Sequence, residues 1–164
     1  MKKSKIIIIV FILLLIVLGV IWYSAQPKDG GGISIIIGDV EQIVEKELIY
    51  NHPDSISFPA VVRSSGQKPI EAEYKGVELS RLFTSLDVDI SNIEKIIFNA
   101  SDGYRIILST EEINDPQNVY LTFERDGEYL KSKKQGGNGP FQLVIRRDPF
   151  SQRWIKHVNE IILN

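Results

Sequence analysis

The chain has 164 residues, and its 19 Lys and Arg against 21 Asp and Glu leave a net charge of −2. It contains no Cys, which excludes disulfides, thiolate metal ligands, a thiol nucleophile and an acylated cysteine anchor. We expect no nucleic-acid partner for a chain of this composition.

The N-terminal region predicts a membrane anchor. Residues 6–23 read IIIIVFILLLIVLGVIWY, and as a helix they span about 27 Å, close to the apolar thickness of a bilayer. Trp22 and Tyr23 suit the membrane interface, and the lysines within residues 1–5 place the N-terminus in the cytoplasm. We therefore expect a single-pass protein of the cell membrane with an extracytoplasmic C-terminal domain.

A cleaved signal peptide is the alternative for this segment. The apolar run is long for a signal peptide, and Tyr23 stands where a cleavage site needs a small residue. Residues 24–32, which include PKDGGG, predict a flexible tether. Residues 33–164 suffice for one domain with its own hydrophobic core, and the anchored, Cys-free chain has a bacterial character.

The outer domain begins with segments that favour strands. Residues 33–37 are β-branched and predict a short strand. Residues 38–48 indicate a turn and a short helix, with Asp39 as its N-cap. In residues 55–66, Pro59 interrupts a strand pattern, which favours either the edge of a sheet or an irregular start of the strand.

The middle of the domain alternates between strands and short helices. Residues 69–76 have the alternation of a half-buried strand. One apolar helical stripe follows at Leu79, Leu82, Phe83 and Leu86. Residues 93–108 predict two strands around an Asp102-Gly103 turn, and Ser109 with Glu112 forms a capping-box pattern for a brief helix.

The last third predicts further strands. Residues 119–130 read as a hairpin, 131–140 as a basic glycine-rich loop and 141–147 as a strand. Residues 153–163 favour a strand, although their apolar spacing also permits a helix. Together these elements predict a β-rich α+β fold.

Charge is divided unevenly along the chain. Residues 24–130 hold 9 Lys and Arg against 19 Asp and Glu, whereas residues 131–164 hold 7 against 2. Such a division marks either a surface for a partner or a basic edge that lies against an acidic one within the domain.

The basic segment lies next to glycines. Gly137 and Gly139 favour close approach of a ligand to backbone N–H groups, and the following strands carry Arg146, Arg153 and Lys156. If these cations meet at the glycine loop, they form a cradle for an anion, with guanidinium groups suited to phosphate. Ordinary solvated turns are the alternative. The sequence predicts no catalytic residue and no metal site, because its two His are far apart and lack ligand spacing.

Five short motifs occur in the order found in one known family. They are Tyr74-x-Gly76-Val77-x-Leu79, Asp102-Gly103-Tyr104, Gly127 with Leu130, Gly139-Pro140 and Ile155-Lys156-His157. Through them, residues 70–162 resemble the molybdopterin-binding domain of sulfite-oxidase-type oxidoreductases. The resemblance implies that fold, molybdopterin as a cofactor, and positions near the pterin phosphate for Arg153 and Lys156.

The chain departs from that family where the metal would bind. The family holds molybdenum through a Cys, but the corresponding residues 61–69 read VVRSSGQKP. Ser64 and Ser65 offer oxygen, a harder donor than a thiolate, which argues against molybdenum here. Gln142 also replaces an Arg of the family pattern.

Three functions follow from these observations. The first is a non-catalytic, membrane-anchored module that binds molybdopterin or another phosphate-bearing ligand. The second is a surface interaction protein whose basic C-terminal segment docks an acidic partner or anionic lipid. The third is an active molybdopterin-dependent oxidoreductase that holds its metal through Ser64 or through the pterin alone.

Overall fold

The computed structural model describes residues 15, 17 and 31–164. Apart from residues 15 and 17, the predicted anchor at residues 6–23 lies outside the described residues, as does most of the predicted tether. Within the described residues, no helix is long and apolar enough to cross a membrane. The anchor and the membrane location therefore stay predictions. Residues 31–164 form one unit.

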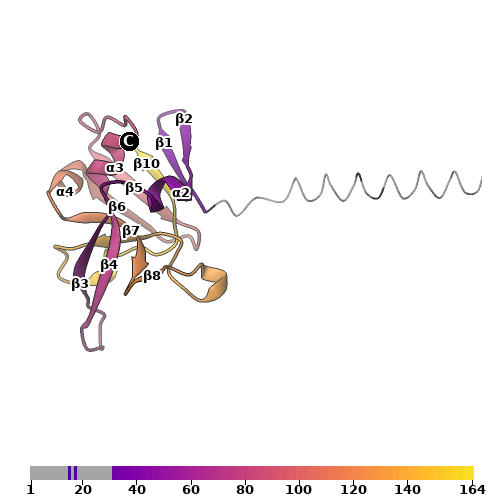
Figure 1. The fold of residues 1–164 in the computed structure, drawn as a ribbon. Coiled ribbons are helices and arrows are strands. Elements are labelled where there is room, and N and C mark those ends of the chain that lie inside the picture. The colour runs from indigo at the N-terminus through magenta and orange to yellow at the C-terminus, as the bar shows by residue number, and fades with distance from the viewer. Residues whose placement is uncertain (1–14, 16, 18–30) are drawn as a thin grey trace, which may run out of the picture. The chain divides into compact units, whose positions relative to one another are not determined.

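One mixed sheet has the strand order β2-β1-β10-β5-β6 (Figure 1). Its strands are β1 (Ile33–Ile37), β2 (Val40–Val44), β5 (Lys95–Ala100), β6 (Arg105–Ser109) and β10 (Val158–Leu163). The C-terminal strand β10 lies in the middle, parallel to β1 and antiparallel to β5. The first and last strands of the domain are thereby held together.

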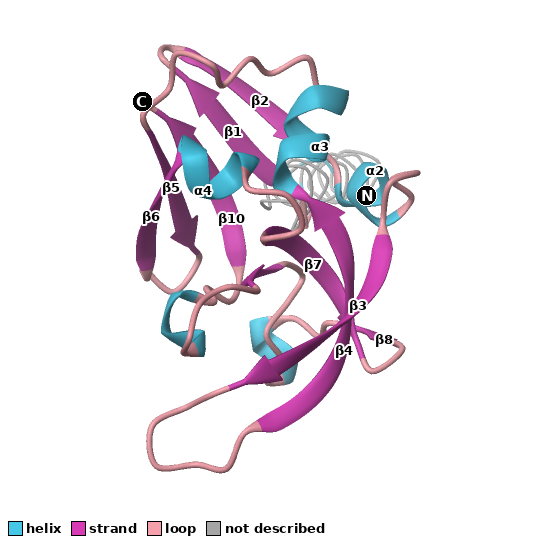
Figure 2. Cartoon of the chain, turned by 90° about the vertical axis from the view of Figure 1, so that its left-hand side faces the viewer, coloured by secondary structure: helices cyan, strands magenta, loops and turns pink. Residues whose placement is uncertain are grey.

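A second, antiparallel sheet has the order β3-β4-β7-β8, with β9 also paired to β7. Its strands are β3 (Ile56–Val62), β4 (Ile70–Glu78), β7 (Val119–Arg125), β8 (Glu128–Tyr129) and β9 (Gln142–Ile145). Figure 2 shows the two groups of strands on opposite sides of the domain. As Pro59 predicts, β3 lies at an edge, where a missing N–H donor is tolerated.

Within residues 31–164, helices are few and short. They are α2 (Lys46–Tyr50), α3 (Leu79–Ser85), α4 (Thr110–Asn114) and the 3₁₀ turns η1 (Lys133–Gln135) and η2 (Ser151–Arg153). In α3, Leu79, Leu82 and Phe83 are buried, and α4 begins at the predicted capping box of Ser109 and Glu112. The prediction of a β-rich α+β fold is confirmed.

The helix predicted directly after Asp39 is wrong. Residues 40–44 form β2, because Gly38 adopts a left-handed φ of 58° and turns the chain back to pair with β1. Asp39 is therefore a turn residue, and the helix starts later, at Lys46, without a side-chain cap. Of the segment predicted as a strand at residues 153–163, Val158–Leu163 form β10, which pairs on both sides, whereas Arg153 ends the turn η2.

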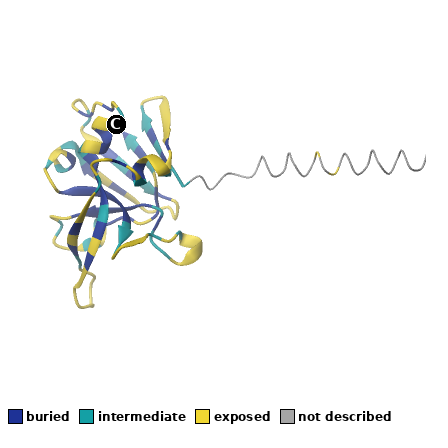
Figure 3. Ribbon diagram, in the orientation of Figure 1, coloured by how far each residue is buried: buried dark blue, intermediate teal, exposed yellow. Residues whose placement is uncertain are grey.

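Buried hydrophobic residues of both sheets and of α3 form one core cluster. Figure 3 shows the buried residues along the strands and the exposed ones at the loops. Phe98, Phe123 and Phe141 are fully buried, and the Phe58 and Tyr120 rings pack with centroids 4.2 Å apart. Trp154 belongs to this core, and its Nε1 donates to the Ile145 carbonyl at 2.9 Å. This core positions the loops that carry the basic residues.

Candidate anion-binding site

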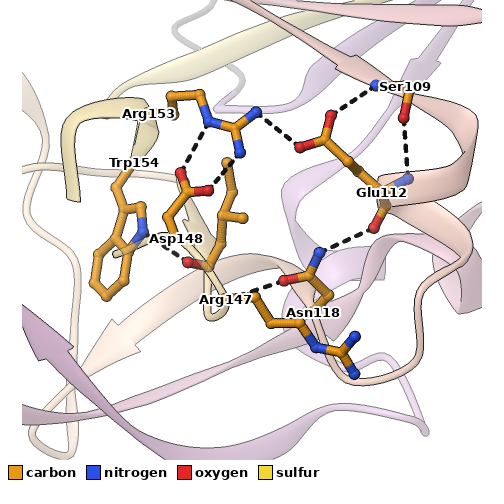
Figure 4. Close-up of polar contacts among 8 residues, drawn as sticks. Ser109, Glu112, Asn118, Arg147, Asp148, Arg153 and Trp154 are labelled. Atoms are coloured by element: carbon orange, nitrogen blue, oxygen red, sulfur yellow. Dashed lines mark hydrogen bonds and ion pairs between the residues drawn. The ribbon is translucent and has the colours of Figure 1, made fainter. Parts of the chain in front are cut away.

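Arg153, a predicted ligand contact, is held in an internal network. Its Nε donates to Asp148 at 2.9 Å, its Nη2 donates to the same carboxylate, and its Nη1 donates to Glu112 Oε1 at 2.8 Å (Figure 4). Glu112 Oε2 accepts from the Ser109 N–H at 3.0 Å, within the capping box of α4. Arg153 therefore ties η2 to α4.

The electrostatics of this network keep both partners charged. The hydrogen bonds that Arg153 donates to Asp148 raise the pKa of Arg153 above its ordinary value, against the opposing effect of burial. Burial alone would raise the pKa of Glu112, but the Ser109 N–H and the Arg153 guanidinium together bring this pKa below its usual value. The network is a structural ion-pair cluster.

A second contact set fixes the segment between α4 and β7. Arg147 donates to the Asp115 carboxylate and, at 3.2 Å, to the Pro116 carbonyl. Asn118 is buried, donates to the Glu112 carbonyl at 3.2 Å and accepts from the Arg147 N–H at 3.1 Å. These contacts match the alternative in which a basic edge lies against an acidic one inside the domain.

The glycine loop is packed against its own chain. The Gly137 N–H donates to the Ser132 carbonyl at 3.0 Å, and the Gly139 N–H donates to the Lys131 carbonyl at 2.8 Å. A Cβ at either glycine would collide with the backbone of residues 130–131. The expectation that these two amides are free donors is therefore wrong. The role of Gly137 and Gly139 as ligand contacts stays a prediction, although their backbone N–H groups, which were expected to bind the ligand, already donate within the loop.

Lys156 lies beside this loop and not in the Arg153 network. Lys156 is exposed, and its backbone forms a bridge with Gln142. The next residue, His157, donates its N–H to the Asn138 carbonyl at 2.9 Å, and its Nδ1 donates to the Gly139 carbonyl at 3.0 Å. In the described part of the chain, no hydrogen bond or ion pair joins Arg153 to the glycine loop. The predicted meeting of these cations at one loop is thus not found.

A surface hollow of about 370 Å³ gathers a different set of cations. It is lined by Pro59, Ala60, Val61, Arg63, Pro116, Gln117, Arg146, Arg147 and Trp154. Among the described residues, no acidic side chain lines it. Strand β3 contributes one wall, and the segment that follows β9 brings Arg146 and Arg147 to the other.

Two of these arginines have no carboxylate partner within residues 31–164. Arg63 is anchored through its backbone, since its N–H donates to Ser151 Oγ at 2.9 Å and its carbonyl accepts from the Ser151 N–H at 3.1 Å. Arg146 stacks over the Phe58 ring at 5.3 Å and donates to the Gln117 carbonyl at 3.4 Å. Asp115 neutralises Arg147, so the hollow keeps an excess of positive charge suited to an oxyanion.

Gln117 also lines a second hollow, of about 260 Å³. It is lined by Pro53, Asp54, Ile56, Glu78, Arg81, Gln117 and Tyr120. An adjoining hollow of about 470 Å³ shares its three charged residues. Gln117 has a left-handed φ of 59°, and its N–H donates to Glu78 Oε1 at 2.6 Å. A strained residue between hollows is typical of functional sites.

Sequence reasoning identified Arg146 but missed Arg63 and Gln117. The sequence indicates Arg63 only through its position: it directly precedes Ser64 and Ser65, in the loop where the family resemblance expects the metal ligand. Gln117 has no signal, because glutamine seldom adopts a positive φ.

Comparisons with known proteins support the fold. No protein-family model matches the sequence, and a search of curated proteins finds no match. Among solved structures, the chain is similar to the crystal structure of the sulfane dehydrogenase SoxCD from Paracoccus pantotrophus, with 20% identity and a TM-score of 0.63. The match covers 80% of this chain and 37% of that chain, so this protein spans little more than a third of its length. The fold is sulfite-oxidase-like.

The described residues suit the phosphate group, but not the metal, of the molybdopterin cofactor that the family resemblance implies. The arginines of the first hollow suit the phosphate of a molybdopterin. Molybdenum lacks its thiolate ligand, because the chain has no Cys, and the described residues contain no group of His, Asp and Glu able to hold a metal. Ser64 and Ser65 lie exposed in the loop after Arg63. The donor set therefore fits a phosphate and not a molybdenum centre.

Proposed function

We propose that the protein is a non-catalytic binding module that holds the phosphate of a pterin, or of another phosphate-bearing ligand, between Arg63 and Arg146. The observation that carries this proposal is the hollow of about 370 Å³ that arginines line and acidic side chains, within the described residues, do not. Guanidinium groups bind phosphate through paired N–H donors, each charge-assisted bond contributing about 1.5–3 kcal/mol. Residues 6–23 would anchor this module to the outer face of the cell membrane.

Cofactor content tests the proposal directly. The full-length protein is purified from a host that makes molybdopterin, and its metal is measured by mass spectrometry and its pterin by fluorescence after oxidation. We expect pterin, or a displaceable phosphate compound, without stoichiometric molybdenum. Stoichiometric molybdenum would instead favour the oxidoreductase, and a protein that binds neither pterin nor inorganic phosphate would overturn the proposal.

A matched pair of variants locates the ligand. Arg63→Gln removes one of the unneutralised cations of the hollow, and Lys68→Gln removes one positive charge from an exposed position in the same loop. We expect Arg63→Gln to weaken phosphate binding about tenfold, the effect of one lost charge-assisted bond, and Lys68→Gln to leave it nearly unchanged. Equal losses in both variants would mean that the loop attracts anions only through its overall charge.

One specific observation supports the alternative that the protein is a surface interaction protein. Lys131 and Lys133 are exposed on the glycine loop, so a basic surface for an acidic partner or anionic lipid remains there. Arg147 and Arg153, however, are already paired with acidic residues of the same domain. A pull-down of acidic partners that Lys131→Gln and Lys133→Gln together abolish, with phosphate binding absent, would favour this alternative.

A further inference from the structure

The first sheet carries a row of isoleucines on the face that points away from the core. Ile36 on β1 lies beside Ile162 on β10, which lies beside Ile97 on β5. Ile97 in turn lies beside Ile107 on β6. The residues before and after each of the last three on their strands include core residues, and side chains alternate between the two faces of a sheet. These four residues, the isoleucine row, therefore cross four neighbouring strands on the outer face.

The row is open to solvent within the described part of the chain. Ile107 is 51% exposed, and the other three are partly exposed. Ile43, 66% exposed on the edge strand β2, lies beside Ser34 and adds a fifth isoleucine to this face. A solvated sheet face ordinarily carries polar side chains, and a continuous apolar stripe on it marks an interaction surface.

Opposite charges stand at the two ends of the row. Glu41 lies beside Ile36 at the β2 end, and Arg105 stands two residues before Ile107 at the β6 end, on the same face. Each makes a hydrogen bond to a neutral side chain, and within residues 31–164 neither forms an ion pair. Both charges are thus available to a partner that covers the row.

These charges favour a second copy of the chain in one orientation. A two-fold axis parallel to β10, the central strand, lays β2 of one copy over β6 of the other. Glu41 of each copy then reaches Arg105 of the other, and Ile162 meets Ile162 at the axis. An axis perpendicular to the strands would instead place Glu41 opposite Glu41, which is unfavourable.

The start of the domain agrees with the same orientation. With the axis along the strands, β1 runs in the same direction in both copies, so both chains enter the domain from one side. Anchors at residues 6–23 of two such copies would reach the same membrane. We propose that two copies of this chain pack sheet against sheet through the isoleucine row, with Glu41 of each paired to Arg105 of the other. Two sheets packed in this way lie about 10 Å apart.

A matched pair of variants tests the surface. Ile107→Glu puts a charge into the row, and Ile70→Glu puts one on β4 of the other sheet, where Ile70 is 50% exposed. Sedimentation equilibrium of the full-length protein in detergent should show a reversible dimer for wild type and Ile70→Glu. We expect Ile107→Glu to dimerise at least tenfold more weakly, with phosphate affinity unchanged. A monomeric wild type, or equal weakening in both variants, would overturn the proposal.

Charge reversal tests the orientation. Glu41→Arg and Arg105→Glu should each weaken the dimer about tenfold, because each places like charges together at two symmetry-related contacts. The double variant restores opposite charges and should dimerise like wild type. A double variant as weak as the single ones would show that Glu41 and Arg105 do not meet.

Cross-linking tests the same contact in membranes without detergent. The chain has no Cys, so Ile162→Cys introduces a single thiol at the axis, and Tyr129→Cys introduces one at a position 57% exposed on β8. A short bis-maleimide should join two copies of Ile162→Cys and few copies of Tyr129→Cys. Equal cross-linking of the two variants, or none in Ile162→Cys, would assign the row to another partner.

Discussion

The two sets of arginines in this domain differ in what surrounds them. Arg153 and Arg147 face the carboxylates of Asp148, Glu112 and Asp115 and hold loops together. Arg63 and Arg146 line a hollow without an acidic wall among the described residues. The same residue type therefore serves structure in one place and leaves charge available for a ligand in the other. Local basic charge in a sequence does not distinguish these cases, because two of the three neutralising carboxylates, Glu112 and Asp115, come from a distant segment.

The largest expected effect comes from Arg153→Ala. Asp148 has a side chain 10% exposed and would lose its bidentate partner, while Glu112 would lose one donor. A partly buried carboxylate left unpaired costs about 2–3 kcal/mol of unfolding free energy, less than for a fully buried pair because Arg153 is half-exposed. Urea unfolding measures this loss, and phosphate affinity should stay near wild type. A stable variant with lost phosphate binding would reverse the roles of the two sets.

Arg146→Gln should have the opposite profile. Arg146 is exposed, makes one long hydrogen bond and stacks over the Phe58 ring, so its removal should lower the unfolding free energy by about 1 kcal/mol or less. Phosphate binding should weaken about tenfold, and its salt dependence should decrease, because one cation leaves the hollow. Calorimetry at two salt concentrations checks both effects. Unchanged affinity would place the anion elsewhere.

Glu112→Gln probes the network through pH. The pKa of Glu112 is lower in the folded protein than its usual value, so the unfolded chain takes up the proton first as pH falls. Its contribution to stability is complete above about pH 5, where the unfolded carboxyl is ionised, and is lost as pH falls through the lower folded pKa. Urea unfolding from pH 7 to pH 3 should therefore show a shallower loss of stability in Glu112→Gln than in wild type. Parallel curves would show that Glu112 titrates alike in both states.

Sequence reasoning reached the elements whose signals are local. The Asp102-Gly103 turn, the hairpin at residues 119–130, the Ser109 capping box and the edge position of Pro59 depend on neighbouring residues, and the structure has all of them. Sequence reasoning predicted a helix at Val40–Val44, but this segment is a strand because it pairs with β1.

The candidate site was harder to predict for the same reason. Arg153 meets Glu112 across 41 positions of the chain, and Arg63 is set by Ser151 across 88. Neither spacing has a recognisable sequence pattern. The loop glycines predict the close approach of a ligand, but in the structure the group that approaches Gly137 and Gly139 is the backbone of residues 130–131.

Lys156→Ala has the smallest expected effect, and it tests directly whether the phosphate binds at the glycine loop or in the arginine-lined hollow. The family resemblance implies that Lys156 contacts a pterin phosphate, whereas the structure places it exposed beside the glycine loop and outside the lining of the arginine hollow. We expect its removal to change unfolding free energy by about 0.5 kcal/mol or less and to leave phosphate affinity unchanged. Lys133→Ala, on the same loop, is the matched control for lost surface charge. If Lys156→Ala alone weakened binding about tenfold, as the loss of one charge-assisted bond would, the phosphate would lie at the glycine loop, and the open arginines would then serve another ligand.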